Sequence, residues 1–273
     1  MLDGDGHLTF DVLAWLSEQS IPLIQIDWMG TVVTVAGATG YGADRKLAAA
    51  QAAAKGNGRA IAIAVGLVRQ KLEAAAVTID GLLPLCETPK LSAEFLREEI
   101  RKIDTAPPKS IGEILGIEGR VAARYFGAIR DLPLKWKGTG AKPISDDWRQ
   151  IGSRLSPLSK RNRDAVHPFN SMLNYGYSML ENQVRVAVIS AGLDPTIGCL
   201  HSSYDEQHAL VFDLMEPLRP VVDRRVLDLV HRYTFSPGDF TLTVDGICRL
   251  NPQLARVVVK AGDLGTEVES VEA

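Results

Sequence analysis

The sequence predicts an α+β protein that is mostly α, with a small N-terminal β-rich domain followed by a large all-helical domain. Two observations lead to this expectation. Strand-like segments at 21–27 and 31–35 occupy much of the first part of the chain. From residue 44 onward, alanine-rich and amphipathic segments with helix-capping residues predominate. We therefore expect a partial β-rich domain at 1–40, a helical domain at 41–265 and an acidic, disordered tail at 266–273.

The N-terminal domain is expected to be incomplete. Besides its two strands it offers one short helix over residues 9–20. A two-stranded hairpin is at best marginally stable alone. We therefore expect either that this domain packs on a partner or that it is truncated, with further strands belonging in front of Met1.

The helical domain is expected to contain successive helices with recognisable start and stop signals. Ser110 and Glu113 have the spacing of a capping box, and Asp194 before a proline predicts another helix start. Pro217 predicts an interruption, because proline removes a backbone donor. The predicted helices cover residues 44–55, 59–77, 91–103, 110–129, 168–191 and 205–216, with two more that end near 231 and 260. Residues 132–158 are rich in Gly, Pro and Ser and predict a mobile loop or an insertion.

Composition narrows the class of protein without identifying it. The formal net charge is −3, which gives no overall sign of nucleic-acid binding, although a local basic patch can still bind phosphate. The three cysteines lie far apart, which favours a reducing compartment, here the cytoplasm, over a disulfide framework or a structural zinc site. The most apolar segment, 60–68, is too short to span a membrane, and the N-terminus has no signal-peptide pattern.

The segment 192–220 contains a candidate metal site. His201 comes a short way before Asp213 and Glu216, which are three residues apart in an apolar run and would share one face of a helix. Buried carboxylates are rare unless they are paired or bind metal, and this ligand set suits Mg²⁺ or Mn²⁺. Two other interpretations stay open. His201 can be a capping or core histidine, and the acids can form ion pairs with Arg219, Arg224 or Arg225.

Two further features could complete such a site. Glu118 lies in the sequence GIEGR on a helix whose other side is apolar, and the alternative is a solvated surface glutamate. A basic cluster at 149–163 lies close before the sequence NYGY at 174–177, and basic side chains beside aromatic ones fit a DNA strand. Such clusters are also common on solvated surfaces. The candidate DNA-binding residues are Arg154, Lys160, Arg161, Arg163, Tyr175 and Tyr177.

Three sequence blocks occur together and in a fixed order: GIEGRVAARYF at 116–126, HPFNSMLNYGYSMLENQVRVAVISAGLDPTIGCLH at 167–201 and LVFDLMEPLRPVVDRRV at 210–226. As a set they resemble the first-numbered CRISPR-associated (Cas) protein family, the spacer-acquisition integrase and endonuclease. The stretches DGICRLNP at 245–252 and WLSEQSIPLIQIDWMG at 15–30 are also similar to this family. The resemblance covers nearly the whole chain, with a shortened N-terminal domain.

The resemblance implies a metal-dependent DNA endonuclease and integrase that joins the 3′-hydroxyl of a foreign DNA fragment to the CRISPR repeat by transesterification. It places the metal ligands, for Mg²⁺ or Mn²⁺, on Glu118, His201 and Glu216, with Asp213 as a nearby acidic companion in the catalytic set. It further implies a homodimer, double-stranded DNA as prespacer and repeat, and a small ferredoxin-like subunit that completes a hetero-hexamer. No membrane association is expected.

Two other functions stay open. The chain could be a catalytically silent DNA-binding scaffold of the same family, which the short N-terminal domain favours and the intact ligand set disfavours. It could also be a transposase-like integrase that works outside CRISPR.

Overall fold

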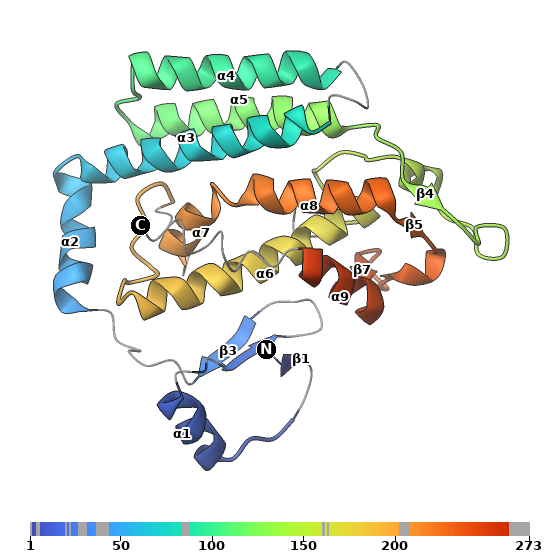
Figure 1. The fold of residues 1–273 in the computed structure, drawn as a ribbon, viewed down its shortest axis with the longest axis horizontal. Helices are drawn as coiled ribbons and strands as arrows, with labels where there is room; N and C mark the ends of the chain where they lie inside the picture. The colour runs from blue at the N-terminus through green and yellow to red at the C-terminus, as the bar shows by residue number, and fades with distance from the viewer. Residues whose placement is uncertain are drawn as a thin grey trace.

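A computed structural model of the chain describes residues 2–3, 6–19, 21, 23–26, 32–36, 44–82, 88–159, 162, 164–201 and 208–261. The predicted fold class is confirmed: the described part is α+β and mostly α, with its first strands near the N-terminus and long helices from residue 45 onward (Figure 1). None of its helices has both the length and the apolar character that crossing a membrane requires.

The N-terminal part consists of a three-stranded sheet and one helix. The sheet has the order β1-β2-β3, with β1 (Leu2–Asp3) parallel and β3 (Val32–Ala36) antiparallel to the central β2 (Leu23–Ile26). Helix α1 (Phe10–Glu18) begins at Thr9, whose hydroxyl accepts the backbone N–H of Val12 at 3.3 Å. The predicted helix and both predicted strands are therefore present.

Two layers of helices form most of the rest of the described chain (Figure 1). After α2 (Arg45–Gly56), the first layer contains α3 (Arg59–Asp80), α4 (Thr88–Thr105) and α5 (Ile111–Ile129), which pack on one another. The second layer contains α6 (Pro168–Ser190), α7 (Ala209–Met215) and α8 (Arg219–Arg232), with α9 (Pro252–Ala261) packed against α6 and α8. Contacts of α3 with α8 and α7 join the two layers, and the site lies at this junction.

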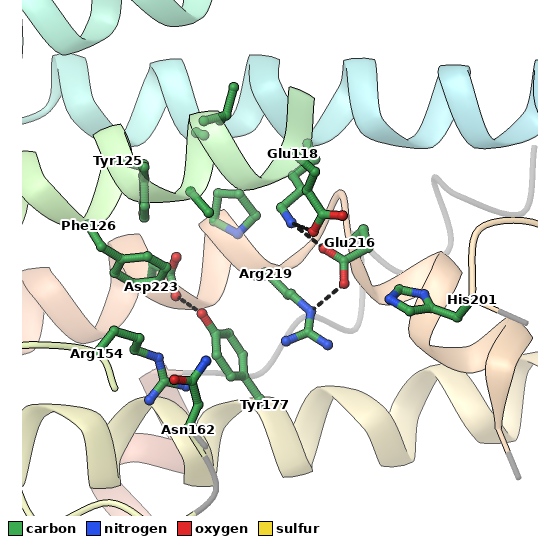
Figure 2. Close-up of a pocket in the computed structure, with 15 residues that line it drawn as sticks. Glu118, Tyr125, Phe126, Arg154, Asn162, Tyr177, His201, Glu216, Arg219 and Asp223 are labelled. Carbon is green, nitrogen blue, oxygen red and sulfur yellow. Dashed lines mark hydrogen bonds and ion pairs between the residues drawn. The ribbon is translucent and has the colours of Figure 1, made fainter. Parts of the chain in front are cut away.

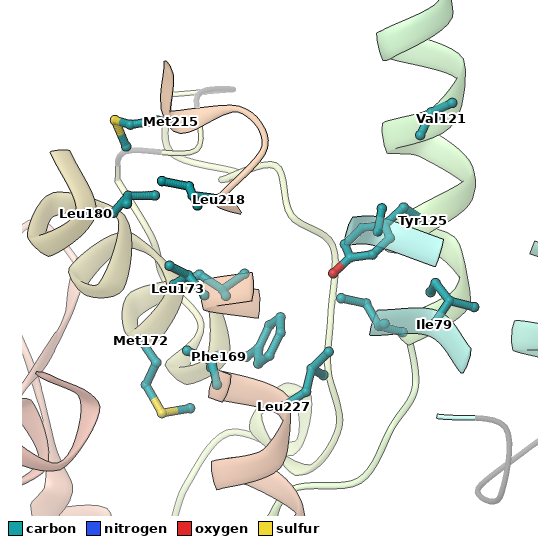
Figure 3. Packing of buried hydrophobic residues seen from close by; sticks show 14 of the residues in the cluster. Ile79, Val121, Tyr125, Phe169, Met172, Leu173, Leu180, Met215, Leu218 and Leu227 are labelled. Atoms are coloured by element: carbon teal, nitrogen blue, oxygen red, sulfur yellow. The ribbon is translucent and has the colours of Figure 1, made fainter. Parts of the chain in front are cut away.

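The core fills the space between these layers. Figure 3 shows Ile79, Val121 and Tyr125 on one side and Phe169, Leu173 and Leu227 on the other. Helices α6 and α8 approach closely where Gly176 lies, because a Cβ there would be only 2.7 Å from Val222 Cγ1. A residue without a side chain is what permits this crossing.

The segment 132–158, predicted as a mobile loop or an insertion, has little regular secondary structure, and side chains anchor parts of it. It contains β4 (Lys135–Trp136), which pairs with β5 (Thr234–Phe235), and the 3-10 helix η1 (Asp146–Arg149). The indole N–H of Trp136 donates to Trp148 O at 2.9 Å, and that of Trp148 donates to Val166 O at 3.2 Å. Near the C-terminus, the 3-10 helix η2 (Pro237–Asp239) leads into a small hairpin of β6 (Phe240–Leu242) and β7 (Cys248–Leu250).

Two predicted helix starts are wrong. Helix α4 begins at Thr88 instead of residue 91. No helix begins at Asp194, whose Oδ1 accepts from the backbone N–H and the hydroxyl of Thr196 at 2.8 and 2.7 Å. The same local hydrogen bonding that makes Asp a good helix cap here closes a turn that does not continue. The predicted start at 205 lies outside the described residues, and α7 ends just before Pro217 as expected.

Candidate functional site

The candidate site is a pocket of about 300 Å³ at the junction of the two helical layers. Figure 2 shows Glu118 and Glu216 in the middle of this pocket, His201 to one side, and Tyr177 and Asp223 to the other. The lining residues are Lys71, Ala75, Glu118, Val121, Ala122, Tyr125, Phe126, Arg154, Asn162, Tyr177, His201, Glu216, Arg219, Pro220 and Asp223. The pocket therefore has charged groups along its length and apolar walls from α3 and α5.

Two carboxylates from distant parts of the chain meet at one ammonium group. Glu118 lies on α5, and Glu216 is the first residue after α7. The Nζ atom of Lys71, on α3, lies 2.5 Å from Glu118 Oε1 and 2.5 Å from Glu216 Oε2. The other oxygen of Glu216, Oε1, forms an ion pair with Arg219 Nε at 2.9 Å. One of the predicted alternative ion pairs, that of Glu216 with Arg219, is thus present.

The charges in this network hold both Glu216 and Lys71 in their ionised forms. Burial alone would raise the pKa of Glu216, but the charges of Arg219 and Lys71 outweigh it and leave that pKa below its ordinary value. Burial would likewise lower the pKa of Lys71, but the charges of Glu216 and Glu118 leave that pKa above its ordinary value. Glu216 is therefore an anionic oxygen donor at neutral pH.

The carboxylate of Asp213 holds His201 in place. Its carboxylate is fully buried and accepts the backbone N–H groups of Cys199, Leu200 and His201 at 2.5, 2.9 and 2.8 Å. Its Oδ1 also lies 2.8 Å from His201 Nδ1. In a neutral imidazole this contact favours a proton on Nδ1 and a lone pair on Nε2, the form in which histidine binds metals. Asp213 and Glu216 lie one turn apart, as predicted, with the backbone N–H of Glu216 donating to Asp213 O at 3.2 Å, but their carboxylates have different partners.

The loop that carries His201 is fixed by close packing. Ahead of it, the side chain of Gln51 on α2 bonds with the backbone of Asp194, donating to its O at 3.0 Å and accepting from its N–H at 2.9 Å. A Cβ at Gly198 would lie 2.6 Å from His201 O and 2.9 Å from Ala209. Only glycine fits this approach, so the loop places His201 beside α7 with little freedom.

A buried polar cluster around Asp223 forms the opposite end of the pocket. Tyr177 donates its hydroxyl proton to Asp223, and the guanidinium groups of Arg154 and Arg219 lie 5.7 and 5.1 Å from the centroid of the Tyr177 ring. Burial raises the pKa of Asp223 from 3.8 to about 6, although Tyr177 and the two arginines favour the ionised form. Burial, followed by the charge of Asp223, raises the pKa of Tyr177 well above 10.

The residues that the sequence predicted as DNA contacts fall into three groups. Arg154 and Tyr177 line the pocket, and Arg154 also donates to Asn174 Oδ1 at 2.8 Å. Tyr175 is partly buried against the hydrophobic core. Outside the described residues lie Lys160, Arg161 and Arg163.

The carboxylate and imidazole groups of the pocket are of the chemical type that binds a hard divalent cation. Two carboxylates already surround one positive charge, and an imidazole oriented through Nδ1 lines the same pocket. Within the described ranges, however, no three His, Cys, Asp or Glu side chains are gathered closely enough to hold a metal ion as they stand. The group that the two carboxylates contact is the ammonium of Lys71. In their chemical type, the donors of the pocket suit Mg²⁺ or Mn²⁺.

Lys71 was not predicted as a site residue, although its position in the sequence indicates a buried ion pair. Leu67, Lys71 and Ala75 follow one another at four-residue steps on α3, and both apolar members of this series are buried. A lysine on the buried stripe of a helix is costly unless it is paired, so its position predicts a buried carboxylate partner. Asp223 was missed for a similar reason, as an acid on the buried side of α8.

Comparison with known proteins shows that the sequence of the chain matches one family. The family model described as CRISPR associated protein Cas1 matches residues 1–263. A CRISPR-associated endonuclease Cas1 1 from Methanospirillum hungatei is 34% identical over 161 residues, which cover 57% of this chain and 43% of that protein. A CRISPR-associated protein Cas1 3 from Methanobrevibacter ruminantium is 29% identical over 248 residues, covering 86% and 68%. In the first of these matches the chain spans less than half of the relative's length.

Solved structures have the same fold. A Cas1 protein from Thermotoga maritima has a TM-score of 0.74 at 23% identity, covering 98% of this chain and 80% of its own. A casposase bound to integration product has a TM-score of 0.62 at 26% identity, covering 94% and 70%. A Cas6-RT-Cas1–Cas2 complex has a TM-score of 0.66 at 21% identity, covering 93% and 26%. The Thermotoga maritima protein and the Cas6-RT-Cas1–Cas2 complex are less than 25% identical to this chain, so their similarity shows the fold alone.

Proposed function

The chain belongs to the CRISPR-associated Cas1 protein family, and on that basis we propose that it is a metal-dependent DNA endonuclease and integrase of CRISPR adaptation. In the proposed reaction the 3′-hydroxyl of a foreign DNA fragment attacks a phosphodiester at the CRISPR repeat. A new 3′-oxygen–phosphorus bond forms, and the attacking hydroxyl loses its proton to a base or to water. The phosphorus–oxygen bond of the repeat strand breaks, and its leaving oxygen takes up a proton to become a free 3′-hydroxyl. The product is a fragment joined to the repeat, which records the foreign DNA.

The observation that carries this proposal is the meeting of Glu118 and Glu216 at one cation beside His201. These side chains come from three separate segments, yet they line one pocket. Phosphodiester exchange needs positive charge near the phosphate, because negative charge grows there in the transition state, and two paired carboxylates could hold a divalent cation that supplies it. A solvated surface glutamate, the alternative for Glu118, does not account for its contact with a partly buried lysine.

Each residue of the pocket has a proposed role in this chemistry. Glu118, Glu216 and His201 would hold Mg²⁺ or Mn²⁺, which would supply positive charge for the phosphate in the transition state. Asp213 orients the imidazole from behind. Arg219, already paired with Glu216, adds a further cation at the pocket. The attacking group belongs to the DNA, so the mechanism requires no covalent protein intermediate.

Substitution of the proposed ligands tests the function. We expect Glu118→Gln and His201→Ala each to lower the integration of a short duplex into a repeat-bearing plasmid with Mn²⁺ by about 100-fold or more. Glu98→Gln is the control, because Glu98 is an exposed carboxylate of α4 that pairs with Arg101 outside the pocket. Full activity in both ligand variants would rule out this site. A wild-type protein that neither nicks nor joins DNA would favour the silent scaffold.

One comparison favours a second candidate, an integrase that works outside CRISPR. Of the three solved structures described above, the casposase alone is more than 25% identical to this chain. It was solved bound to an integration product. The same assay separates the two candidates when the plasmid target is varied. Insertion confined to the boundary of a CRISPR repeat supports adaptation, whereas equal insertion into plasmids without a repeat supports the second candidate.

The proposed assembly is a homodimer that binds double-stranded DNA together with a small ferredoxin-like adaptation subunit in a hetero-hexamer. Its support is family membership, together with the Cas1–Cas2 complex among the structures that share this fold. Light scattering of the chain alone and mixed with the small subunit tests it. A monomer that stays unchanged in the mixture would contradict the assembly.

A further inference from the structure

The ammonium group of Lys71 occupies the point that both carboxylates of the pocket face. Its Nζ lies 2.5 Å from an oxygen of Glu118 and 2.5 Å from an oxygen of Glu216. The side chain of Lys71 is 15% exposed and that of Glu216 only 4%, so water replaces little of this contact. Arg219 already neutralises the other oxygen of Glu216. The only charge partner of Glu118 among the ion pairs of the described residues is Lys71.

The position of Lys71 makes a purely incidental ion pair a poor explanation. The residue lies on the buried stripe of α3, between Leu67 and Ala75, where an apolar side chain would pack without loss of hydration. Burying an ion pair often stabilises a protein no more than apolar residues of similar volume would. Without a cation between them, however, Glu118 and Glu216 would repel each other in a pocket of low dielectric. A resident positive charge therefore keeps the two acids together when no other cation is bound.

We propose that Lys71 is the resident counter-cation of the metal-free centre and that a divalent metal must displace its ammonium to reach Glu118 and Glu216. This inference rests on the proposed metal centre. Two cations cannot occupy the same point between two carboxylates, and the long flexible stem of lysine lets its charge withdraw while its methylenes stay packed. Lys71 thereby sets the affinity of the centre for metal and keeps the empty centre folded.

Mn²⁺ binding measured by titration calorimetry, with no DNA and no catalysis, tests this role. We expect Lys71→Met to bind Mn²⁺ about tenfold more tightly or better, because no ammonium competes. Lys71→Arg should bind Mn²⁺ more weakly than wild type, because the rigid guanidinium fork holds both carboxylates. Arg69→Met is the matched control: Arg69 lies on the same helix and also contacts two carboxylates, Glu73 and Asp104, but at the exposed surface. Its Mn²⁺ affinity should equal that of wild type.

Thermal unfolding gives a second readout that covers a variant with poor folding. In EDTA we expect Lys71→Met to melt below wild type, and in saturating Mn²⁺ we expect the difference to close. A variant that Mn²⁺ does not rescue, or a Lys71→Met affinity equal to or weaker than that of wild type, would overturn the inference. A different result would show that the metal centre itself is wrong. In that case wild type would not bind Mn²⁺, or Glu118→Gln would bind Mn²⁺ as well as wild type does.

Discussion

At the scale of single residues, the pocket separates charged groups that face a ligand from charged groups that hold others in place. Glu118 and Glu216 both face the ammonium of Lys71. The oxygens of Asp213 instead accept hydrogen bonds from three backbone N–H groups and contact His201 Nδ1. The sequence could nominate these acids from their apolar surroundings. It could not assign their partners, because the segments that meet here lie far apart in the chain and the direction of each side chain depends on that meeting. The cation, Lys71, was missed for the same reason.

Asp223 makes the stability of the protein dependent on pH. Its pKa is higher in the folded protein, about 6 against 3.8, so its protonation stabilises the fold at low pH and that stabilisation is lost as pH rises through 6. The Asp223→Asn variant does not lose this stabilisation as pH rises, because an asparagine side chain does not titrate. Between pH 5 and pH 7.5 we expect wild type to lose roughly 1.5 kcal/mol of unfolding free energy relative to Asp223→Asn.

Urea denaturation of both proteins across this range measures the difference. The expected result is a gap that changes in favour of the asparagine variant as pH rises, with its midpoint between the two pKa values. Parallel stability curves for the two proteins would contradict a buried, proton-binding Asp223.

At the scale of elements, close packing fixes the geometry of the pocket. Helix starts and stops were largely readable from the sequence, because Thr9, Asp44 and Ser110 cap their helices through local hydrogen bonds. The false helix start at Asp194 shows the limit of such signals, since the same bonds also close an isolated turn. The close contact of α6 with α8 at Gly176 could not be predicted in this way, because the sequence does not show which helices pack against each other.

Gly176 tests whether the crossing of α6 and α8 is tight. A methyl group at this position would meet Val222 at 2.7 Å, whereas one at the exposed Gly127 of α5 would meet nothing within 4 Å. We expect Gly176→Ala to lower the unfolding free energy by roughly 1–2 kcal/mol despite its better helix propensity. Gly127→Ala should raise it by up to about 1 kcal/mol. Denaturant unfolding measures both, and two stabilised variants would show that the helices do not press on this position.

At the scale of the whole molecule, the fold class and most of the helices followed from capping and periodicity, and the family from the order of three motif blocks. The arrangement of two helical layers around one pocket did not, because α3, α5 and α8 meet through contacts between residues far apart in sequence. Their meeting brings Glu118 and Glu216 together at Lys71 in a pocket that His201 also lines, and this pocket is the proposed metal centre.

Anomalous X-ray scattering from crystals of the protein with and without Mn²⁺ tests this feature most directly. With Mn²⁺ we expect a peak about 2.0–2.3 Å from an oxygen of Glu118, an oxygen of Glu216 and Nε2 of His201, with Lys71 Nζ moved away. Without Mn²⁺, Lys71 should lie between the two carboxylates. A peak elsewhere in the molecule, or Lys71 still between Glu118 and Glu216 at saturating Mn²⁺, would contradict the centre.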